Sequence, residues 1–139
     1  MSAARERLRI LVADDFRDSA ESLALLLRLG GDEVHVARDG LEAVEAAEQL
    51  RPDVVLLDLR MPRLDGLGAC RRIRAQDWGR RMLLIAQSGL GVATVEGAGA
   101  AGFDAHLVKP VDPAALEELF ARHGAARALD RLALSSRAR

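Results

Sequence analysis

Short, almost uninterrupted apolar runs are the feature of this sequence that most limits its fold. The strongest run, Val54–Leu57, is followed at once by Asp58, and similar runs cover Leu8–Ala13 and Met82–Ala86. A strand with one face in water alternates apolar and polar residues, whereas a strand covered on both faces is apolar along its whole length. These runs therefore predict strands of a parallel sheet with helices on both faces.

Segments with helical periodicity separate the apolar runs. We expect helices over Asp18–Leu29, Leu41–Leu50, Leu64–Ala75, Val92–Ala101 and Pro113–His123, and two further strands over Glu33–Ala37 and Ala105–Val108. In the first helix, the spacing places Leu23, Leu26 and Leu27 on one face. Because crossovers between parallel strands are right-handed, this order predicts a single α/β domain with a doubly wound, five-stranded parallel sheet.

The composition limits the possible partners and the compartment. The chain has 139 residues, of which 50% are hydrophobic, which suits one domain with one core. A net charge of −1 gives no reason to expect nucleic-acid binding or binding to a membrane surface. Met1–Arg9 lacks the apolar run of a signal peptide, and no stretch approaches the roughly 20 apolar residues that span a bilayer. A single cysteine, Cys70, excludes an internal disulfide framework, so we expect a cytoplasmic protein.

Polar residues stand where the predicted strands end. Asp14 and Asp15 follow the first strand, Asp58 the third, Ser88 the fourth and Lys109 the fifth. The carboxyl ends of parallel strands meet at one edge of a sheet, which is where such sheets bind ligands. The sequence therefore predicts that these side chains form one cluster.

The chemistry of that cluster points to phosphoryl transfer. Three carboxylates that lie close together raise one another's pKa unless a cation joins them, and hard oxygen ligands suit Mg²⁺. An aspartate can accept a phosphoryl group covalently, and a metal ion, a lysine and a hydroxyl can neutralise and position that group. Lys109 is the only lysine among 20 basic residues. Lysine carries a compact charge that can reach a single oxygen, and arginine, with its planar fork, is not interchangeable with it in that role.

Each of these residues also has a simpler interpretation. Asp15 can cap a helix, Asp58 can be a loop residue, Ser88 can belong to an ordinary turn, and Lys109 can be a strand terminus. Taken singly, each signal is weak. All of them at one sheet edge, in this order, favour a functional site.

Four motifs at these positions resemble the receiver domain of bacterial two-component response regulators. They are DD at 14–15, VVLLDLRMPRLDG at 54–66, QSG at 87–89 and LVKP at 107–110. The resemblance extends over roughly Leu8 to His123. It implies a flavodoxin-like receiver fold for residues 1–123. Residues 124–139 run on beyond the resemblance, and we expect this extension to be a short helix or disordered.

The resemblance also implies a role for each site residue. Asp58 is the expected phospho-acceptor, and Lys109 and Ser88 are expected to hold the phosphoryl oxygens. The expected ligands of Mg²⁺ or Mn²⁺ are Asp58, Asp15, Asp14 partly through water, and the backbone carbonyl of Arg60. Ser88 is also expected to act as a switch together with His106, which stands where the family usually has Tyr or Phe.

The implied function is that of a stand-alone receiver. It would accept a phosphoryl group from a histidine kinase or phosphotransfer protein, catalyse its own phosphorylation and dephosphorylation, and signal to an unknown downstream protein by protein–protein contact. Two alternatives stay open: a receiver module of a hybrid histidine kinase or phosphorelay protein, and a phosphate-independent binding module. Whether the chain forms a homodimer is also open. A dehalogenase-type hydrolase is excluded, because it would place a second aspartate two residues after the first, where this chain has Arg60.

Overall fold

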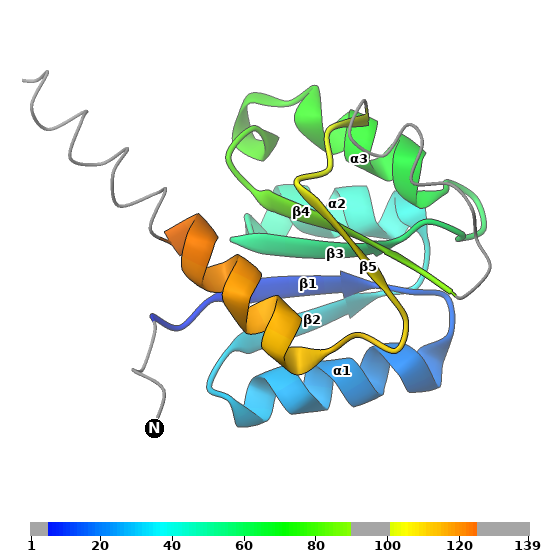
Figure 1. The fold of residues 1–139 in the computed structure, drawn as a ribbon. Helices are drawn as coiled ribbons and strands as arrows, with labels where there is room; N and C mark the ends of the chain where they lie inside the picture. Colours follow the sequence, from blue (N-terminus) through cyan, green and yellow to red (C-terminus); the bar gives the residue numbers. More distant parts are fainter. Residues whose placement is uncertain (1–5, 90–100, 125–139) are drawn as a thin grey trace, which may run out of the picture. The chain divides into compact units, whose positions relative to one another are not determined.

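A parallel sheet forms the centre of the unit made by residues 6–109, seen here in a computed structural model that describes residues 6–89 and 101–124. Its strands are β1 (Arg9–Ala13), β2 (Glu33–Ala37), β3 (Val54–Asp58), β4 (Leu83–Ser88) and β5 (Ala105–Val108). They pair in the order β2-β1-β3-β4-β5, and every pair is parallel (Figure 1). This is the strand order of flavodoxin-like folds, so the predicted fold class is confirmed.

Helices cover both faces of this sheet. Helix α1 (Arg17–Leu29) lies on one face, and α2 (Gly40–Leu50) and α3 (Gly66–Arg74) lie on the other (Figure 1). A short 3₁₀ helix, η1 (Asp77–Gly79), follows α3. The helix predicted over 92–101 lies outside the described residues except for its last position, and so does the predicted extension from residue 125 onward.

Residues 113–124 form a further helix, one residue longer than predicted, and they belong to a different compact unit from residues 6–109. Within that helix Leu116 and Phe120 are buried, as their spacing indicates. Among the described residues, no helix is long and apolar enough to cross a membrane.

The core beneath α2 and α3 contains apolar side chains from both helices and from the strands. Its buried members include Leu11, Val55, Leu57, Leu84, Ala43, Ala47, Ala69 and Ile73. Cys70 lies in the same core, where burial raises the pKa of its thiol to about 11. A thiol in this environment stays protonated at neutral pH and is inert.

The buried face of α1 differs from the prediction. Ala20, Ala24 and Leu27 are buried, whereas Leu26 is 51% exposed. The predicted inward position of Leu26 is therefore wrong. A helix that rests closely on a sheet places small residues at the closest approach, and alanine serves that purpose in α1.

Aspartates fix the beginnings of the other two helices. The side chain of Asp39 accepts a hydrogen bond from the backbone N–H of Glu42, and that of Asp65 accepts one from Gly68. Because Asp65 is the cap, α3 begins at Gly66, two residues later than predicted. This cap leaves residues 59–65 as a loop beside the end of β3.

Candidate functional site

Two aspartates at the end of β1 differ sharply in exposure. Asp14 is 1% exposed, and its backbone N–H continues the sheet by donating to the carbonyl of Ala37 at 3.1 Å. One of its carboxylate oxygens accepts from the backbone N–H of Phe16 at 3.0 Å. Asp15 is exposed. The first position is therefore fixed by the sheet, and the second faces solvent.

Asp15 does not cap α1. The capping position is Phe16, and no side chain makes a cap hydrogen bond there. The simpler interpretation of Asp15 as a helix cap is therefore wrong. Its carboxylate is available for another purpose.

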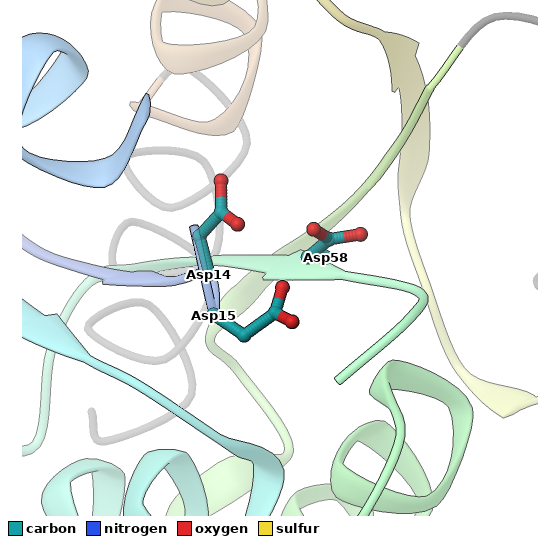
Figure 2. Close-up of side chains that lie close together, drawn as sticks. All are labelled: Asp14, Asp15 and Asp58. Atoms are coloured by element: carbon teal, nitrogen blue, oxygen red, sulfur yellow. The ribbon is translucent and has the colours of Figure 1, made fainter. Parts of the chain in front are cut away.

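Asp58, the last residue of β3, completes an acidic cluster. Asp14, Asp15 and Asp58 each offer a carboxylate oxygen, and these oxygens all lie within 4.8 Å of one another. Figure 2 shows the three side chains around one small space at the ends of their strands. The sheet thus brings together all three carboxylates that the sequence predicted.

Lys109 joins two of these carboxylates. Its Nζ donates to Oδ2 of Asp14 at 2.6 Å and to Oδ2 of Asp58 at 2.9 Å. The backbone N–H of Lys109 donates to the carbonyl of Ser88 at 2.7 Å, which fixes the end of β5 against the end of β4. The lone lysine of the sequence is therefore the cation of this cluster.

Burial and charge act against each other on these groups. Burial raises the pKa of Asp58, and the charge of Asp14 adds to that effect, while hydrogen bonds from Lys109 and from the backbone N–H of Arg60 lower it. For Lys109, burial alone would lower the pKa, but the hydrogen bonds from Nζ to Asp14 and Asp58 outweigh it and the pKa is raised. Lys109 therefore keeps its positive charge, whereas the surroundings of Asp58 disfavour its ionised form.

Backbone hydrogen bonds of the loop after β3 fix the position of Asp58. The backbone N–H of Arg60 donates to Asp58 Oδ1 at 3.2 Å, and that of Gly66 donates to the carbonyl of Leu59 at 3.1 Å. A Cβ atom at Gly66 would lie 2.4 Å from the carbonyl oxygen of Asp58. Sequence reasoning gave Gly66 no role, although a glycine directly after a helix-capping aspartate was the available signal. The predicted metal ligation by the Arg60 carbonyl stays a prediction.

Ser88 and His106 contact each other beside the acidic cluster. Ser88 is the last residue of β4, so the ordinary-turn interpretation is wrong, and it is 2% exposed. Its Oγ lies 2.7 Å from Nε2 of His106, on β5. The sequence predicted that both residues belong to the site, but it did not predict this hydrogen bond.

Comparison with known proteins agrees with this geometry. Residues 10–121 match the model of the response regulator receiver domain. The response regulator MprA of Mycobacterium sp. (strain KMS) is 44% identical over 115 residues, which cover 83% of this chain and 48% of MprA. MprA of Mycobacterium leprae is 43% identical over the same share of this chain and 49% of its own length. The chain therefore spans about half the length of these curated relatives.

Solved structures show the same likeness. The receiver domain of the sensor histidine kinase PA1611 from Pseudomonas aeruginosa PAO1, solved with a magnesium ion in its active-site cleft, has a TM-score of 0.77 and 36% identity, with 84% of this chain and 97% of that one covered. The receiver domain of AraT, a response regulator from Geobacillus stearothermophilus, has a TM-score of 0.77 and 28% identity, with 91% and 99% covered. This chain belongs to the family of response regulator receiver domains.

Proposed function

We propose that this receiver domain accepts a phosphoryl group on Asp58 from a histidine kinase or phosphotransfer protein in the cytoplasm, and that it signals by contact with a downstream protein. The observation that carries this proposal is the cluster of three carboxylates within 4.8 Å, with Lys109 bonded to two of them. Three carboxylates so close together repel one another, which makes the fold less stable. Its combination of a nucleophile with a fixed cation is what phosphoryl acceptance requires.

The donor set fits a divalent metal ion, Mg²⁺ or Mn²⁺. Asp14, Asp15 and Asp58 supply hard oxygen ligands, and the backbone carbonyl of Arg60 would add a fourth. Three carboxylates carry more negative charge than Lys109 offsets, which favours a dication. The related receiver domain of PA1611 was solved with magnesium in its active-site cleft. When bound, such a metal neutralises the charge on the oxygens of the transferring phosphoryl group.

The proposed reaction forms an acyl phosphate on Asp58. A carboxylate oxygen of Asp58 attacks the phosphorus of a phosphohistidine, an O–P bond forms, and the N–P bond breaks with its electron pair going to the imidazole nitrogen. Lys109 and the N–H of Arg60 already orient that carboxylate. After transfer, Lys109 and the hydroxyl of Ser88 bind phosphoryl oxygens. Attack by water on the phosphorus later returns the free carboxylate and inorganic phosphate.

Phosphorylation from a small donor tests this proposal. Acetyl phosphate with Mg²⁺ should add the mass of one phosphoryl group to the intact protein, and hydroxylamine should remove it, because acyl phosphates are cleaved by that nucleophile. Asp58→Ala should abolish the mass gain. Asp77→Ala is the matched control, since the Asp77 side chain is 93% exposed and pairs only with Arg80 among the described contacts.

Two outcomes would contradict the proposal. An equal mass gain in Asp58→Ala would place the acceptor on another residue. A wild-type protein that gains no mass and binds no beryllofluoride, a phosphoryl mimic, would favour the phosphate-independent binding module instead.

The same chemistry also suits a receiver that is one module of a longer protein. This chain covers 97% of the PA1611 receiver, which is part of a sensor histidine kinase, and about half of the MprA relatives. The same site would then act as a module of a hybrid kinase or phosphorelay protein. An immunoblot of the native organism, with an antibody against residues 6–89, distinguishes a stand-alone receiver from a module by the mass of the band.

A further inference from the structure

We propose that His106 is a positioning residue that holds the hydroxyl of Ser88 in the unphosphorylated protein, in competition with the phosphoryl group for that hydroxyl. This inference rests on the proposed function, because it assigns the regulation of the same site. Its basis is the 2.7 Å contact between Ser88 Oγ and His106 Nε2.

The contact is built into the pairing of two strands. Ala86 pairs with His106, and Ser88 pairs with Val108, in the parallel register of β4 and β5. Alternate residues of a strand share a face, so Ser88 lies on the same face as Ala86 and beside His106. Ser88 is 2% exposed, so water competes little for its hydroxyl.

The hydroxyl can serve only one of its two partners fully. A serine has a single hydrogen to donate. When His106 Nε2 is unprotonated, it accepts that hydrogen, so the hydroxyl must give up this bond before it can donate to a phosphoryl oxygen. Competition requires this tautomer, since a protonated Nε2 would donate to Oγ and leave the serine hydrogen free for the phosphoryl group. Phenylalanine, one of the usual residues of the family here, has no ring atom that can make this bond.

The strengths of the two hydrogen bonds decide whether the Ser88 hydroxyl binds His106 or the phosphoryl group. A neutral hydrogen bond contributes a factor of about five to an equilibrium, whereas a bond to an ionised oxygen is roughly twice as strong in free energy. The phosphoryl group therefore still captures Ser88, but less completely than it would without His106. The hydrogen bond sets a threshold for activation and does not block it.

A double-mutant cycle measures this competition directly. Beryllofluoride affinity, in the presence of Mg²⁺, is titrated by calorimetry for the wild type, His106→Phe, Ser88→Ala and the double variant. His106→Phe should bind beryllofluoride about fivefold more tightly while Ser88 is present, and should change nothing in the Ser88→Ala background. His106→Leu, a second variant without a ring nitrogen, should behave as His106→Phe does.

Rescue and control variants separate positioning from a structural role. His106→Gln places an amide near the position of Nε2 and should return the affinity toward the wild-type value. His35→Phe is the matched control, because His35 lies on β2 and bonds to Glu33, and it should leave the affinity unchanged.

The outcomes that overturn this inference differ from those that overturn the proposed function. Equal tightening with and without Ser88, or no tightening in either His106 variant, would show that His106 does not act through the serine. A wild-type protein that binds no beryllofluoride would overturn the proposed function first, and this inference with it.

Discussion

At the scale of single residues, Asp58 carries a charge that its surroundings disfavour. Burial raises its pKa above the ordinary value of 3.8, and Lys109 offsets this only in part. The folded protein therefore holds a proton on Asp58 more tightly than the unfolded chain does. By linkage, this group makes the fold progressively less stable as the pH rises through the window above 3.8.

Replacing Asp58 by asparagine should therefore stabilise the metal-free protein at neutral pH. We expect a gain on the order of 1 kcal/mol in the free energy of unfolding, because the variant keeps the volume and removes the buried charge. Lys109 retains Asp14 as a partner. Urea denaturation in EDTA at several pH values between 4 and 7 measures the effect, which should shrink toward the acidic end.

The same measurement on Asp77→Asn, at an exposed position, gives the baseline. Loss of stability in Asp58→Asn would mean that the ion pair with Lys109 outweighs the cost of burying the charge.

Sequence reasoning predicted which residues lie together at the sheet edge, because their positions follow from topology. Asp14, Asp58 and Lys109 each stand at the end of an apolar run, and parallel strands end at one edge. The hydrogen bond between Ser88 and His106 could not be predicted in this way. It depends on the rotamers of two side chains, and residue type and spacing do not determine those.

At the scale of elements, the connection from β3 to α3 determines how closely Asp58 is held. Asp65 caps the helix, and Gly66 then passes the carbonyl of Asp58 so closely that a Cβ atom would lie 2.4 Å from its oxygen. Real Cβ atoms do not approach a backbone oxygen so closely. A side chain at residue 66 must therefore push the helix start away from the strand end.

Gly66→Ala should accordingly destabilise the fold and disturb the site. We expect a loss of about 1–3 kcal/mol in the free energy of unfolding, the usual cost of overpacking, together with weaker beryllofluoride binding. Chemical denaturation and calorimetry measure the two effects.

Gly30→Ala is the matched control for this substitution. Gly30 has a φ of −78° and its nearest neighbour would lie 3.4 Å from a Cβ atom, so alanine should be neutral or slightly stabilising there. If Gly66→Ala behaves like Gly30→Ala, the loop is more adaptable than its close contact indicates.

Helix α1 shows that a helix can be predicted from the sequence although the face that it buries is not. Its residues were predicted as helical to within one position, but its buried face was not. Leucines at 23, 25, 26, 27 and 29 give almost every side of the helix an apolar residue. Periodicity then cannot select a face, and the close fit of Ala20 and Ala24 on the sheet decides it.

At the scale of the whole molecule, metal binding should stabilise the native state by mass action. Mg²⁺ at ten times its dissociation constant adds about 1.4 kcal/mol, and for a chain of this size that raises the melting temperature by roughly 5 °C. Differential scanning calorimetry with Mg²⁺, and then with EDTA, measures the shift and its reversal.

Asp15→Asn should remove most of this shift, because it takes one carboxylate from the predicted ligand set. Asp18→Asn is the control: Asp18 is an exposed residue in the first turn of α1, outside the acidic cluster. An undiminished shift in Asp15→Asn would exclude Asp15 as a ligand.

The strand order was the most predictable property of the molecule. Apolar strands that alternate with helices leave few arrangements once crossovers are right-handed, and the observed order is one of them. The start of α3 was harder to predict, because it depends on which polar residue satisfies the free N–H groups of the first turn.

The bond between Lys109 and Asp14 joins residues 95 positions apart in the chain. A ribosome releases the amino end first, so all three aspartates leave the exit tunnel long before Lys109 does. Until β5 is added to the sheet, a nascent chain carries the acidic cluster without its lysine. Under the proposed function, a nascent chain would therefore accept no phosphoryl group until β5, the last of the described strands, has been made.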